Sequence, residues 1–70
     1  MKFLIFTGYA GHPTAINQDY IVEVIEDNEE TSRVGTAGGV DGVSEYTLPV
    51  EFKKLLRDLE VGKTLNYLPK

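Results

Sequence analysis

Five carboxylates fall within eight consecutive residues of the sequence: Glu23, Glu26, Asp27, Glu29 and Glu30. Paired carboxylates can carry out acid–base chemistry, but that chemistry needs a cleft that drives their pKa values apart. Residues 27–30 mark a turn, and a turn tip offers no such cleft. The cluster therefore favours one of two structures. It is either a solvated, charged turn or a negative patch that binds a basic groove on another protein.

The only histidine, His12, lies in a glycine-rich segment from Gly8 to Pro13. Such a loop can cradle phosphate groups with its backbone N–H groups, and a histidine can act as a general base. The segment lacks the Gly-Lys-Ser/Thr ending of a P-loop, and no partner for His12 is visible. We expect a tightly turned or mobile loop, with nucleotide or small-ligand binding as the alternative.

Metal and cofactor chemistry has few candidate residues. The chain has no cysteine and one histidine, a poor set for zinc. Asp41 lacks the alternating Asp and Asn ligands of a calcium loop. Lys54 and Asp58 have the spacing of a helical ion pair. The sequence predicts no catalytic residue, no metal, no cofactor and no enzymatic activity.

Three segments favour β-strands. Residues 2–7 and 20–25 are apolar and rich in β-branched or aromatic side chains, and residues 32–37 form a weaker candidate that contains a glycine. Residues 8–18 have the glycine, proline and asparagine content of a loop. Residues 43–47 are either a short extra strand or an extended lead-in.

One helix is expected, beginning near Leu48. Pro49 suits the first helical position, and Gly62 suits a left-handed helix stop. Apolar residues recur at helical spacing between these two points and define one face. They are Phe52, Leu55, Leu56 and Leu59. Residues 63–68 alternate as a final strand.

The element order is therefore β-β-β-α-β in one domain spanning residues 1–70. This predicts an α+β fold, with a mostly antiparallel sheet and one helix packed on one face. A right-handed crossover through the helix would place the last strand parallel to the first. The expected strand order is 4-1-2-3.

The first two strands carry apolar side chains on both faces, since side chains alternate along a strand. A single helix covers only one face of a sheet. The other face must be covered by residues 8–18, by residues 38–47, by a second copy of the chain or by a partner. Exposure of several large apolar side chains would cost roughly 1.5–3 kcal/mol each.

The chain has 70 residues and a net charge of −4. Direct binding to nucleic acid is therefore not expected, because that needs basic surface. The apolar run from Met1 to Phe6 is too short for a signal peptide or a membrane span. The lack of cysteine favours a reducing compartment. We expect a cytoplasmic protein without membrane contact.

The segment from Leu48 through Phe52 to Val61, Gly62 and Asn66 is similar to the helix-Gly-strand ending of one anti-CRISPR protein, a type I-F inhibitor. The chain as a whole, short, acidic and free of cysteine, resembles the small inhibitors encoded by bacteriophages, the anti-CRISPR proteins among them. The resemblance implies a partner that is a large protein or nucleoprotein in the host-cell cytoplasm. It carries over no functional residue.

The leading hypothesis is a non-enzymatic interaction protein that binds and inhibits a larger protein or nucleoprotein complex with a basic surface. The acidic segment from Glu23 to Glu30 is its expected binding site. The alternative is a small regulatory or housekeeping domain that forms a homodimer through its open sheet face. A binder of nucleotides or small ligands at residues 8–13 is the third hypothesis.

Overall fold

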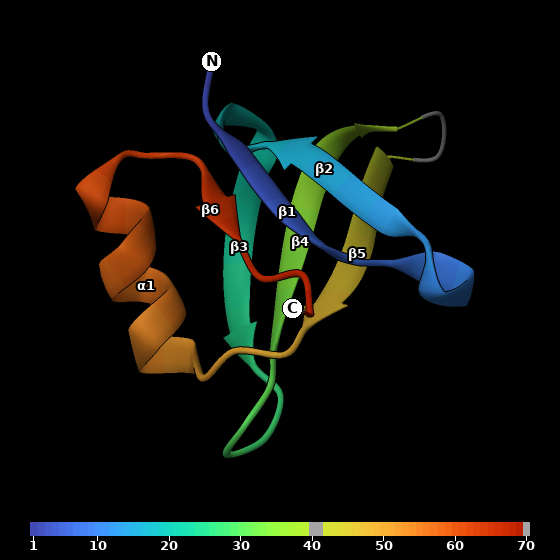
Figure 1. Cartoon of the computed structure of the whole chain (residues 1–70). Helices are drawn as coiled ribbons and strands as arrows, with labels where there is room; N and C mark the ends of the chain where they lie inside the picture. Colours follow the sequence, from blue (N-terminus) through green and yellow to red (C-terminus); the bar gives the residue numbers. More distant parts are fainter. Residues whose placement is uncertain (40–41, 70) are drawn as a thin grey trace.

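The computed structural model describes residues 1–39 and 42–69, which contain six strands and one α-helix (Figure 1). Three strands form the first sheet, sheet A, in the order β2-β1-β6: β1 (Phe3–Thr7), β2 (Pro13–Asn17) and β6 (Leu65–Asn66). The other three form sheet B in the order β3-β4-β5: β3 (Ile21–Glu26), β4 (Ser32–Gly39) and β5 (Gly42–Leu48). Asp41 lies outside the described residues.

The α+β class is confirmed, and the pairing is mostly antiparallel. β1 pairs with β2 antiparallel, and β3, β4 and β5 form an antiparallel meander. The last strand, β6, runs parallel to β1, with Leu4 opposite Leu65, as the crossover argument predicts. In the described part of the chain, no helix has the length and apolarity that crossing a membrane requires.

The predicted single sheet with strand order 4-1-2-3 is wrong, because residues 8–18 contain a strand. The Gly8 N–H donates to the His12 carbonyl at 2.7 Å, so the chain reverses within a few residues and β2 returns along β1. A Cβ at Gly8 would collide with the Thr14 side chain, and only glycine permits this close return. A short 3₁₀ turn, Gln18–Tyr20, then leads the chain into the second layer.

The two sheets pack face to face, and the strands of sheet A run obliquely across sheet B in Figure 1. Six apolar side chains form the buried core. They are Leu4 and Phe6 from β1, Val34 from β4, Leu48 from β5, Val50 from the following turn and Leu55 from the helix. Sheet B therefore covers the inner face of β1, while Phe3 and Ile5 are only half-buried.

The helix α1 (Phe52–Val61) lies beside β3 and ends at Gly62, whose φ of 78° confirms the predicted left-handed stop (Figure 1). The predicted start is wrong: Glu51 is the N-cap, and Pro49 lies in the preceding turn. The buried Ser32 hydroxyl donates to the Val50 carbonyl at 2.7 Å. This hydrogen bond holds the turn that contains Pro49 against β4, and the helix begins after this turn, at Phe52.

Candidate functional site

The turn between β3 and β4 is the acidic end of the molecule and protrudes below the sheets in Figure 1. Asn28 Oδ1 accepts hydrogen bonds from the N–H groups of Glu30 and Thr31, at 2.8 and 2.9 Å. The Thr31 hydroxyl donates to Asp27 Oδ2 at 2.9 Å. These hydrogen bonds fix the backbone of the turn, so its carboxylates project from a defined base.

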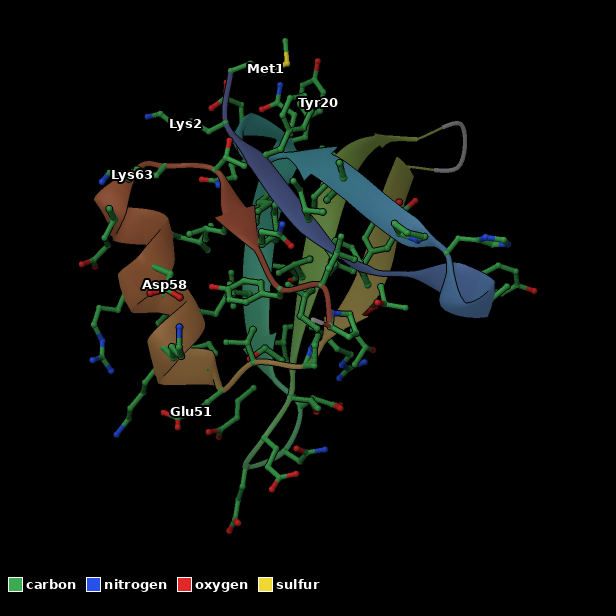
Figure 2. The ribbon with its side chains drawn as sticks, viewed as in Figure 1. Met1, Lys2, Tyr20, Glu51, Asp58 and Lys63 are labelled. Carbon is green, nitrogen blue, oxygen red and sulfur yellow. The ribbon has the colours of Figure 1, made fainter. Side chains whose placement is uncertain are left out.

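Four of the five predicted carboxylates share this end, Asp27 among them. Glu26, Glu29 and Glu30 are exposed, and we call them the acidic tip. None of them makes an ion pair with another described residue. Figure 2 shows Glu51 at the start of α1, at the same end of the molecule. Unpaired carboxylates on a rigid turn keep their charge available to an approaching basic surface.

Glu23 does not belong to the acidic tip. It lies on the outer face of sheet B, where it pairs with Gly35, which in turn pairs with Glu45. A Cβ added at Gly35 would lie 2.8 Å from Glu23 Cγ, so the glutamate side chain lies across the glycine. The structure therefore separates Glu23 from the four carboxylates that it accompanies in sequence.

Asp27 is partly neutralised by Arg33, which the sequence analysis did not single out. Arg33 Nε lies 3.4 Å from Asp27 Oδ1, and Nη1 lies 3.4 Å from Glu45 Oε2. These side chains are 34–47% exposed, and such pairs are worth at most about 1 kcal/mol. Their main effect is that Arg33 balances the negative charge of Asp27, so Asp27 adds little to the charge that a partner would meet. Only the strand register could have revealed this arrangement.

The Gly8–Pro13 segment forms the tip of the β1–β2 hairpin. Three of its five N–H groups are already used: Gly8 donates to His12, Gly11 to Gly8, and His12 to Tyr9. Phosphate binding by such a loop needs free N–H groups, so the loop offers little support for nucleotide binding. Tyr9 is 91% exposed at this tip.

One side-chain network contains two groups with shifted pKa values, and it joins α1 to the segment after β6. Asp58 Oδ2 lies 2.7 Å from Lys54 Nζ and accepts a hydrogen bond from the Tyr67 hydroxyl at 2.6 Å. These contacts, Lys54 first, hold the pKa of Asp58 below its usual value of 3.8. Burial, and then Asp58, raise the pKa of Tyr67. The Lys54–Asp58 pair was predicted; the tyrosine was not.

The contacts of this network hold α1 to the segment after β6. Three of the hollows over the described residues have volumes of about 330, 360 and 430 Å³, and neither Asp58 nor Tyr67 lines any of these three. The described residues also include no cluster of histidine and carboxylate side chains that could hold a metal ion.

Comparison with protein-family models, with curated proteins and with solved structures finds no match.

Proposed function

We propose that this chain is a non-enzymatic interaction protein that binds a larger protein or nucleoprotein complex and inhibits it. The acidic tip, Glu26, Glu29 and Glu30, makes the first contact. The target presents lysine and arginine, as surfaces that grip nucleic acid do. We expect this to take place in the cytoplasm of a host cell, as the resemblance to bacteriophage inhibitors implies.

The observation that carries this proposal is a turn fixed by side-chain hydrogen bonds that holds carboxylates with no ion pair to another described residue. Flexible charged side chains lose entropy when a partner orders them, and a preorganised backbone reduces that cost. The Asn28 and Thr31 hydrogen bonds supply this preorganisation. Charges of one sign on a protruding surface mainly raise the association rate, and salt weakens the effect.

A specific observation favours the second candidate, a self-associating regulatory domain. Phe3 and Ile5, on the outer face of sheet A, are only half-buried. A second copy placed on this face would bury them. This candidate uses a different surface, so the oligomeric state of the free protein distinguishes it from the first.

The test begins with an affinity pull-down from a bacterial lysate and identification of the retained complex by mass spectrometry. Binding of that complex is then measured for the double variant Glu29→Lys, Glu30→Lys. We expect the affinity to fall at least about tenfold, or about 1.4 kcal/mol, mainly through a slower association rate. Duplex DNA should compete with the unmodified protein for the complex.

The matched control is Asp19→Lys, Glu60→Lys. It has the same net charge as the test variant, and both of its positions are exposed. Asp19 lies in the turn before β3 and Glu60 in the last turn of α1, and these segments are at the opposite end of the molecule from the β3–β4 turn in Figure 1. If the two double variants lose affinity equally, only net charge matters and the acidic tip is not the binding site. If neither loses affinity, the tip is a solvated turn.

A further inference from the structure

Strand β2 is an edge strand, because sheet A has the order β2-β1-β6. Two hydrogen bonds delimit its ladder with β1. Gly8 N–H donates to the His12 carbonyl at 2.7 Å, and Gln18 N–H donates to the Lys2 carbonyl at 2.9 Å. Hydrogen-bonded pairs alternate along an antiparallel ladder, so every second residue of β2 directs its backbone groups away from β1.

The groups that point away are the Pro13 carbonyl, both backbone groups of Ala15 and the Asn17 N–H. Within the described residues, no hydrogen bond outside the strand ladders reaches them. Pro13 has no N–H, which limits the edge at one end. What remains is a short row of donors and acceptors with the spacing of a β-ladder.

Apart from Pro13 at one end, this edge lacks the usual protection. Natural edge strands carry charged side chains, or a helix or loop covers them. The other sheet follows that rule, since β5 carries Glu45 and β3 lies beside α1. No strand of sheet A contains a charged residue, although 26% of the chain is charged. The β2 edge therefore suits a neutral partner.

A hollow of about 360 Å³ adjoins the edge, between β2 and the ends of β4 and β5. Those ends project past β2 in Figure 1, so sheet B extends beyond sheet A there. Ile16, Tyr46 and Thr36 are among the lining residues, and none of the lining residues is charged. A strand added to β2 would lie over this hollow and cover it.

We propose that the β2 edge binds an extended segment of a partner protein, which joins sheet A as an additional strand. Backbone hydrogen bonds supply affinity in this mode of recognition, and pockets for alternate side chains supply specificity. In the added strand, one residue lies opposite Ala15. The side chains of its two neighbours point into the hollow, and they are uncharged. A second copy fits less well, because the projecting end of its own sheet B would compete for the space over the same hollow.

This surface is separate from the acidic tip, which lies at the other end of the molecule in Figure 1. The protein would hold two partner surfaces: a charged one that attracts and a neutral one that pairs strand to strand.

The test uses a library of linear heptapeptides displayed on phage, selected against the immobilised protein. We expect the enriched peptides to carry uncharged side chains at alternate positions. One such synthetic peptide, titrated into nitrogen-labelled protein, should shift the amide signals of Ala15 and Asn17 and slow their hydrogen exchange. These two amides are the ones that the edge leaves free.

The matched control is a scan of backbone N-methyl groups along the same peptide. Affinity should fall about tenfold, the loss of one backbone hydrogen bond, at every second position and stay near that of the parent peptide between them. This scan needs no change to the protein. The proposal is overturned if no peptide binds, if the scan is flat, if the Ala15 and Asn17 amides do not respond, or if the free protein dimerises with those amides protected.

Discussion

The hydroxyl of Tyr67 donates a hydrogen bond to Oδ2 of Asp58 at 2.6 Å, and this contact ties the segment after β6 to α1. Lys54 reaches the same oxygen at 2.7 Å and lies 5.6 Å from the centre of the tyrosine ring. The helix is therefore held by a charged hydrogen bond to the segment after β6 as well as by the packing of Leu55 and Leu59 at the apolar core.

Replacement Tyr67→Phe should lower the free energy of unfolding by about 1–2 kcal/mol, because hydrogen bonds to charged groups contribute about 1.5–3 kcal/mol and this one is partly exposed. The change removes one oxygen and keeps the ring. Urea denaturation followed by circular dichroism measures it. Tyr9→Phe, at a position 91% exposed, is the control and should leave stability unchanged. Equal stability of both variants would mean that the hydrogen bond contributes nothing.

Asp58 should make stability depend on acid pH. Its pKa in the folded protein lies below the ordinary value of 3.8, chiefly because of Lys54 and then Tyr67. A lowered pKa means that the carboxylate stabilises the fold above the unfolded pKa, and this contribution is lost as the pH falls through the folded pKa. Asp58→Asn should be less stable than the parent at neutral pH, with the difference shrinking below about pH 4. A difference that stays constant from neutral pH to about pH 2 would contradict this.

Ser32→Ala should cost about 1–3 kcal/mol, the penalty for leaving a buried acceptor without its donor. The Ser32 side chain is fully buried, and its hydroxyl donates to the Val50 carbonyl at 2.7 Å. Thermal or urea unfolding gives the measurement. Ser44→Ala, at an exposed position of the neighbouring strand, serves as the comparison and should change stability little.

Leu55→Ala should cost about 2–5 kcal/mol, because Leu55 is fully buried between α1 and the sheets. Leu59 is only partly buried, so Leu59→Ala should cost less. Leu56→Ala, on the same helix but 38% exposed, should cost least. Chemical denaturation of the three variants tests this order. A Leu56 variant as unstable as the Leu55 variant would show that the core face of the helix is misassigned.

Much of the fold can be predicted from the sequence, because strong local patterns determine it. The β-branched run of residues 20–25 and the glycine stop at Gly62 lead directly to β3 and to the end of α1. Strand β2 escapes prediction, since Pro13 and Asn17 at its ends are typical of loops. Its extended conformation comes from pairing with β1, which the local sequence does not encode.

Only part of the candidate site could be predicted from the sequence, for a similar reason. Density of charge along the chain identifies Glu29 and Glu30, but only the register shows that Glu23 lies across Gly35 and that Arg33 neutralises Asp27. Likewise the Asp58 contact with Tyr67 depends on where the chain returns after the helix. Contacts across strands depend on pairing, and neither pairing nor sheet membership can be read from residue types alone.

The parallel pairing of β1 with β6 sets the order in which the molecule can assemble during synthesis. Strands β3, β4 and β5 are consecutive and close through short connections, so sheet B can form as soon as they are made. Strand β1 is synthesised first, yet its neighbour on one side is residues 65–66. Until those residues leave the ribosome, one edge of β1 stays open, and this early apolar strand is the segment most exposed to misassociation.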